Sequence, residues 1–171
     1  LGDALTLACD RLVWAGGQQT APGRLTASLR RSAAGIEWDA VVEMDRPVKS
    51  VTTIIRGVPR GHVSFGAGGF RDPRDDELLA GYAFGAGDLN GPGGSMATPL
   101  LMIQTAGDVF YVSSLDDHMR PKRFYLAPGE GSYRVEAVYE HDAWREDRRV
   151  SVPAWRLGRA ASEQAAVAPH V

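Results

Sequence analysis

Carboxylates are the side chains of this chain best suited to catalysis, because two of them placed together can serve as general acid and general base. The consecutive residues Asp116, Asp117 and His118 stand where an expected hairpin ends. Adjacent strand residues point to opposite faces, so Asp116 and Asp117 need a further partner that the sequence does not identify. We assign these three residues to polar contacts with a ligand or a partner domain, and we assign no residue to catalysis.

Two glutamates of one expected strand, Glu136 and Glu140, share a face and are a second choice of catalytic pair. Their separation in a strand is about 13 Å. Glycosidases hold their two carboxyl groups roughly 5–9.5 Å apart, so this pair is too widely spaced. We expect Glu136 to share a solvated face with Arg134. The opposite face then carries Tyr133, Val135, Ala137 and Tyr139.

Aromatic residues near the C-terminus are candidates for binding. Trp144 and Trp155 stand beside charged or turn residues, where an exposed indole stacks on a sugar ring or docks onto another domain. With Tyr139 they form the expected stacking or docking set. Ordinary packing in the core is the alternative for these residues.

Neither a metal nor a cofactor is expected. Cys9 is the only cysteine, which excludes an intrachain disulfide and a cysteine-based metal site. The four histidines lack zinc-hydrolase spacing, and the glycines of residues 85–91 lack dinucleotide-binding spacing. Residues 72–77 offer oxygen ligands for which calcium is conceivable, but they lack EF-hand spacing. We expect a solvated acidic turn there.

Length and charge limit the function classes. A chain of 171 residues is most simply one domain with a full core. Its 19 basic and 21 acidic residues give a net charge of −2, which offers no attraction to nucleic acid or to an anionic membrane. No apolar run is long enough to span a membrane, and no signal peptide is visible. The start at Leu1 suggests a processed chain, so a cytoplasmic location and a secreted chain with its signal removed both stay open.

Alternating and β-branched segments predict an all-β antiparallel sandwich. Three hairpins are expected, with strands at 24–31 and 36–44, 98–105 and 109–114, and 123–127 and 132–139. Further strands are expected at 4–8 and 48–56, with a short continuation at 61–65, and two more runs are expected on either side of Pro153, at 148–152 and 155–157. Pro153 should place the last strand at a sheet edge or split it.

Two segments depart from this pattern. Residues 66–96 are rich in glycine and should form a long crossover loop, in which 77–84 is a strand or a brief helix. This loop is the expected place for a binding surface, with a mobile crossover as the alternative. Residues 1–158 form the predicted domain. The Ala-rich residues 159–171 are a helix-prone tail or a linker toward a missing domain.

The last third of the chain carries a resemblance to a known family. Residues 98–104, followed by 108–114, form an apolar run after a proline, a turn, and an aromatic strand ending in serine. The strands at 123–125 and 133–136 and the exit through Pro153, Ala154 and Trp155 extend the pattern. It resembles the non-catalytic N-terminal β-sandwich domain of multidomain bacterial glycoside hydrolases.

This resemblance implies an ancillary domain that packs on a catalytic domain and contacts carbohydrate at the edge of its sheet. In such families the acid and the nucleophile lie on a barrel, so no catalytic residue is carried over. Two other functions stay open: a stand-alone carboxylate-dependent polysaccharide hydrolase or lyase, and a protein-assembly module. A reading frame that continues beyond Val171 would favour the ancillary domain.

Overall fold

The computed structural model describes residues 4–13, 17, 19–65, 69–83, 95–96, 98–118, 120–142 and 144–170. Within them, one sheet contains seven strands in the order β1 (Ala4–Cys9), β4 (Gly23–Ser32), β5 (Gly35–Met44), β14 (Arg149–Ala160), β11 (Val109–Ser114), β10 (Leu100–Gln104) and β7 (His62–Ser64). The second has the order β6 (Ser50–Pro59), β13 (Ser132–Glu140), β12 (Lys122–Pro128), β8 (Leu79–Ala83) and β9 (Ser95–Met96). A small ribbon pairs β2 (Leu12–Val13) with β3 (Thr20–Ala21).

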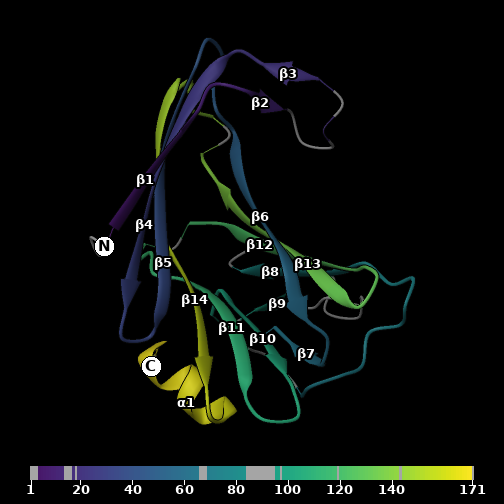
Figure 1. The fold of residues 1–171 in the computed structure, drawn as a ribbon. Helices are drawn as coiled ribbons and strands as arrows, with labels where there is room; N and C mark the ends of the chain where they lie inside the picture. The colour runs from purple at the N-terminus through teal and green to yellow at the C-terminus, as the bar shows by residue number, and fades with distance from the viewer. Residues whose placement is uncertain are drawn as a thin grey trace.

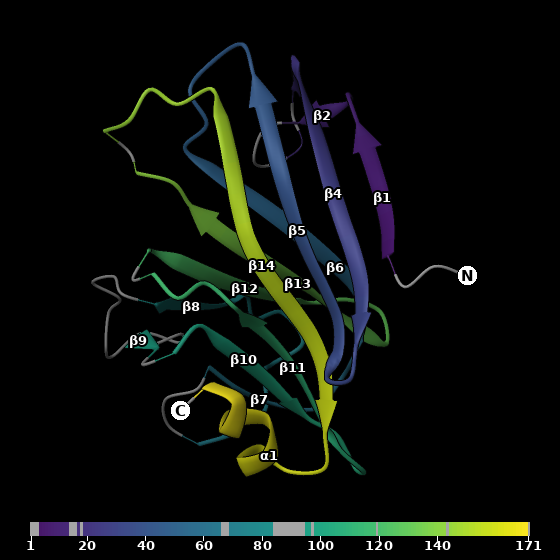
Figure 2. The same ribbon diagram turned by 90° about the vertical axis from the view of Figure 1, so that its left-hand side faces the viewer.

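The chain is an all-β, sandwich-like fold whose sheets do not close on themselves. Figures 1 and 2 show the two large sheets as facing layers whose strands cross at a wide angle. The strand pairs of both layers are antiparallel, apart from the short parallel pair of β8 and β9. No helix in the described ranges has the length and apolar character needed to cross a membrane.

The three expected hairpins are confirmed as β4–β5, β10–β11 and β12–β13. In β13 the expected faces are also confirmed, because Tyr133, Val135, Ala137 and Tyr139 are buried while Arg134 is exposed. Arg134 forms an ion pair with Glu136 at 2.8 Å on the wetter face. The core between the sheets contains Trp38, Ala40, Val42, Val63, Leu101, Ile103, Val112, Phe124, Leu126, Val135, Ala137 and Trp155.

Pro153 neither splits the last strand nor places it at an edge, so that expectation was wrong. Strand β14 lies in the interior of its sheet between β5 and β11. Its register with β5 shifts between Val152 and Trp155, and this bulge accommodates the missing proline N–H. The carbonyl of Ala154 is still used, accepting from the Leu115 amide at 2.7 Å.

The C-terminal segment is packed against the domain over residues 159–170 and contains the expected helix, while a further domain after it stays a prediction. Strand β14 continues to Ala160, and Ser162 caps the helix α1 (Glu163–Val167) by accepting from the Ala165 amide. A short 3-10 turn, η1 (Ala168–His170), follows. Ala166 is fully buried against the outer face of β10 and β11.

The expected crossover loop contains more structure than its glycines suggested. Within the segment at 77–84, the strand β8 occupies Leu79–Ala83 and pairs with β12, so the strand alternative is the one observed there. Strand β9 pairs with β8 in turn. The remaining stretches at 66–68 and 84–94 lie outside the described residues, so the expected binding surface on this loop stays a prediction.

Candidate functional site

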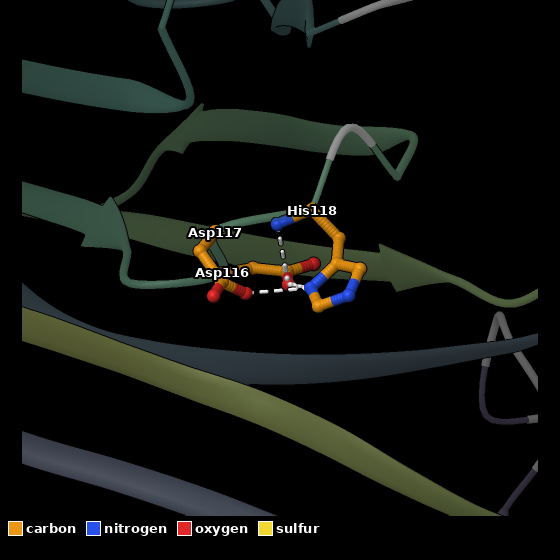
Figure 3. Close-up of side chains that lie close together, drawn as sticks. All are labelled: Asp116, Asp117 and His118. Carbon is orange, nitrogen blue, oxygen red and sulfur yellow. Dashed lines mark hydrogen bonds and ion pairs between the residues drawn. The ribbon is translucent and has the colours of Figure 1, made fainter.

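The residues assigned to polar contacts do lie together. Asp116, Asp117 and His118 occupy the connection between β11 and β12, and their possible ligand atoms lie within 4.8 Å of one another. Figure 3 shows the His118 ring turned back toward the two carboxylates. Its Nδ1 lies 2.5 Å from Asp117 Oδ1, and its backbone amide donates to Asp116 Oδ1 at 3.1 Å.

A buried lysine already neutralises this cluster. The Nζ atom of Lys122 lies 2.8 Å from Asp116 Oδ2, and the two side chains are only 0% and 2% exposed. Lys122 also donates to the carbonyl of Arg120 at 3.0 Å. A metal ion at this cluster would compete with the ammonium group for the Asp116 carboxylate. The arrangement therefore fits an ion pair that fixes the β11–β12 connection better than it fits a cation site.

The pKa of Asp116 reports on this ion pair. Burial acts to raise the pKa of the Asp116 carboxyl, but hydrogen bonds from Lys122 and from the His118 amide outweigh it and hold the pKa below the ordinary 3.8. Burial likewise lowers the pKa of the Lys122 ammonium, and Asp116 opposes that shift.

Acid should therefore destabilise the fold through Asp116. A carboxylate with a depressed native pKa stabilises the fold above its unfolded pKa, and this stabilisation is lost as the pH falls through the native pKa. We expect the free energy of unfolding to fall steadily below about pH 4. The Asp116→Asn variant should be less stable at neutral pH but show a flatter decline in urea unfolding at low pH. An equally steep decline in the variant would contradict this role.

Tyr139 belongs to the core rather than to a stacking surface, because it is only 1% exposed. Its hydroxyl accepts from Arg120 at 3.1 Å and lies 3.5 Å from Nδ1 of His141. Nε2 of His141 lies 2.8 Å from Asp147 Oδ2, and this contact is the main cause that lowers the pKa of Asp147. These contacts connect β13 to the chain entering β14, so we read them as structural.

The two tryptophans differ sharply in exposure. Trp155 is 1% exposed and packs edge-to-face against Phe124 at a centroid distance of 5.6 Å. The expectation that Trp155 is exposed for stacking was wrong, because the β14 bulge turns it into the core. Trp144 is 93% exposed and stays available for a ligand or partner.

In the acidic turn at 72–77, the carboxylates of Asp75 and Glu77 pair with nearby arginines. Glu77 accepts from the Arg74 amide at 3.2 Å and pairs with Arg71 at 3.0 Å. The Arg74 amide is the main cause that lowers the pKa of Glu77. Asp75 pairs with Arg60 at 2.5 Å. This geometry agrees with a solvated turn and does not point to a calcium site.

Sequence reasoning missed an apolar groove of about 500 Å³ that lies between the two sheets. Its lining residues are Leu7, Leu25, Ala27, Leu29, Ile36, Trp38, Ala40, Val51, Thr52, Thr53, Ile54, Ile55, Arg56 and Leu157. On the side of β5, the Trp38 Nε1 donates to Thr53 Oγ1 at 3.2 Å and links the sheets. We call this hollow the β6 groove.

Large apolar side chains are exposed around the β6 groove. Leu5, Leu7, Ile36 and Ile54 are each between 46% and 56% exposed. In the paired strands, Leu5 lies opposite Leu29 and Leu7 lies opposite Ala27, so β1 extends the apolar inner face beyond the part that the second sheet covers. An exposed apolar patch of this kind usually marks an interaction site.

The opposite face of β4, β5 and β14 is polar, and its charged side chains form ion pairs with one another. Glu37 alternates with Ile36 and Trp38, and it is held between Arg30 at 2.9 Å and Arg156 at 2.8 Å. The hydrogen bond from Arg156 is the main cause that lowers the pKa of Glu37. Since charges on this face are paired with one another, the apolar β6 groove is the better candidate for a functional surface.

Comparison of the chain with family models, with curated proteins and with solved structures found no match.

Proposed function

We propose that this chain is a non-catalytic β-sandwich module that docks onto a partner through the β6 groove. The observation that carries the proposal is the groove itself, an open apolar hollow with half-exposed Leu7, Ile36 and Ile54 at its margins. Leaving these side chains in water is unfavourable by roughly 25 cal/mol per Å² of apolar surface, and a docked partner removes that cost.

The carboxylates support a non-catalytic role. Asp116, the most buried acid of the candidate cluster, is paired with Lys122, and Asp147 is paired with His141 and Arg145. A general acid needs a raised pKa, whereas the pKa values of Asp116 and Asp147 are lowered by these partners. The alternative of a stand-alone hydrolase or lyase therefore has less support than docking.

The resemblance to the sandwich domains of bacterial glycoside hydrolases gives the docking module a specific setting. In that setting the partner is the catalytic domain of a carbohydrate-active enzyme, and the chain is its ancillary domain. The exposed indole of Trp144 favours an additional contact with carbohydrate, because a solvent-facing ring can stack on a sugar. Loss of glycan-array binding in Trp144→Ala would support that contact, and an array that shows no binding would contradict it.

Two measurements on the purified chain test the docking module. It should release no reducing sugar from a panel of polysaccharides, and it should enhance the fluorescence of anilinonaphthalene sulfonate, a dye that reports exposed apolar surface. Leu7→Gln should reduce the dye signal by at least about half, because it removes apolar area from the groove. Leu78→Gln is the matched control, since Leu78 is 55% exposed but lies outside the groove. Sugar release, or a dye signal equal in both variants, would contradict the proposal.

A further inference from the structure

The β6 groove follows the edge of a strand rather than one face of a sheet. Its lining includes every residue from Val51 to Arg56. Consecutive residues of a strand point to opposite faces, so a hollow that touches all of them must run along the edge of β6. The run of six residues is about 17 Å long.

The main chain along this edge has no strand beside it in the described part of the protein. Strand β6 is the terminal strand of its sheet and pairs only with β13, on its other side. A row of backbone N–H and C=O groups therefore faces the groove. Such a row is a template for pairing with another extended chain.

From Ser50 to Ile55 this edge also lacks the features that keep strands from pairing, and the register shift of β6 against β13 lies beyond it, between Ile55 and Val58. Edge strands are usually protected by charges, prolines or bulges that turn the edge away. The first six residues of β6, Ser50 to Ile55, contain no charge and no proline, and neither does β1, which is one of the two edge strands of the other sheet. Five of those six residues, Val51 to Ile55, are β-branched, and such residues favour extended pairing.

One charge lies at the end of the groove. Arg56 is the only charged residue of the lining. Arg56 takes part in none of the ion pairs that join the described residues. A partner that is neutral along the groove and acidic at this end matches the charge of the site.

We propose that the partner docks by β-strand addition: an extended segment of about six residues pairs with the free edge of β6, places alternate apolar side chains in the groove and sets a carboxylate against Arg56. Strand addition is a recurring mode of recognition in which main-chain hydrogen bonds give affinity and side-chain pockets give specificity. This inference rests on the proposed docking function. It names the chemistry of the partner, an alternating apolar peptide with an acidic end.

A synthetic peptide tests the inference. The probe is ten residues long, capped at both ends, labelled with a fluorophore, and alternates valine with serine after an N-terminal glutamate. Anisotropy should show saturable binding in the micromolar range. A second peptide with the same side chains carries N-methyl groups on alternate residues, which removes the donors on one edge. Its binding should be weaker by roughly thirtyfold, because two to three main-chain hydrogen bonds are lost.

Variants of the chain locate the site. Ile54→Lys places a protecting charge on the edge and should weaken peptide binding at least about tenfold, while Leu78→Lys changes it by less than about twofold. Both positions are solvent-exposed, so circular dichroism should show the same fold. Arg56→Glu should weaken binding by up to about fivefold, and exchanging the peptide's glutamate for lysine should restore it.

Four outcomes overturn strand addition. The first is that the N-methylated peptide binds as tightly as the unmodified one, and the second is that hexadecanoate displaces the peptide. The third is that no peptide binds, and the fourth is that the chain forms a dimer which Ile54→Lys dissociates. The second would make the groove an acyl-chain site, and the fourth would make a second copy its occupant. The dye and polysaccharide measurements separate these failures from a failure of the docking module, since dye binding at Leu7 does not depend on strand pairing.

Discussion

Trp155→Ala should lower the free energy of unfolding by about 3–5 kcal/mol, the usual cost of emptying a buried aromatic site. The indole lies opposite Trp38 in the β5–β14 pairing and packs against Phe124 of the facing sheet. Its removal leaves a cavity that borders both sheets. Urea unfolding followed by circular dichroism measures the loss.

Trp144→Ala is the matched control, because the same substitution is made where the indole is in water. It should change the free energy of unfolding by no more than about 0.5 kcal/mol. A loss below about 1 kcal/mol for Trp155→Ala would show that the ring is not in the core. Carbohydrate binding that depends on Trp155 in a stable variant would restore its sequence-based assignment as a ligand residue.

Lys122→Met should be comparably severe, at about 3–5 kcal/mol, because it leaves the Asp116 carboxylate buried without its counter-charge. It also removes the hydrogen bond that Lys122 donates to the Arg120 carbonyl. Urea unfolding at neutral pH measures the effect. Lys49→Met is the control, since Lys49 also donates to a carbonyl, that of Arg145 at 2.8 Å, but is half exposed and lies 3.8 Å from its acidic partner Glu146, so its loss should cost no more than about 1 kcal/mol.

A second substitution separates the ion pair from mere packing. In Lys122→Met combined with Asp116→Leu no buried charge is left unpaired, so the double variant should recover much of the lost stability. Two losses that simply add would contradict the claim that Lys122 acts through Asp116. Folded Lys122→Met protein that gains thermal stability from zinc would instead assign Asp116, Asp117 and His118 to a metal site that the lysine normally blocks.

The local parts of the fold could be predicted from the sequence. Each hairpin has its own turn and its own alternation, as in the segment around Gly35, where β4 and β5 pair from Gly23 to Met44. Gly35 has a φ of 137°, and a Cβ there would lie 2.1 Å from the Leu157 carbonyl oxygen. The glycine is thus needed both for the turn and for the close approach of β14.

The long-range parts could not be predicted, because they depend on which strands become neighbours. Pro153 indicated an edge, yet β14 is held between β5 and β11 because a bulge absorbs the proline and turns Trp155 inward. Lys122 reads as an ordinary surface lysine, and its burial follows from the path of the β11–β12 connection. The residues next to Pro153 and Lys122 in the sequence do not show whether the strand lies inside the sheet or whether the lysine is buried.

The β6 groove was missed for the same reason. The segment at 48–56 was correctly expected to be a strand, but nothing in its residues states that it ends a sheet. That position arises because β6 pairs with β13, some 80 residues away in the chain. The absence of charge from Ser50 to Ile55 is the one signal that could have suggested an open, pairing edge.

The most direct test of the central claim is an NMR titration of the isotope-labelled chain with the valine–serine peptide. If the peptide adds to the edge of β6, amide shifts should appear along β6 at residues 50–56 and across the groove at residues 25–29 of β4. Residues 116–118 and 139–147 should stay unchanged. Shifts confined to the region of Asp116, Asp117 and His118, with β6 unaffected, would contradict the account and move the functional surface to the polar cluster.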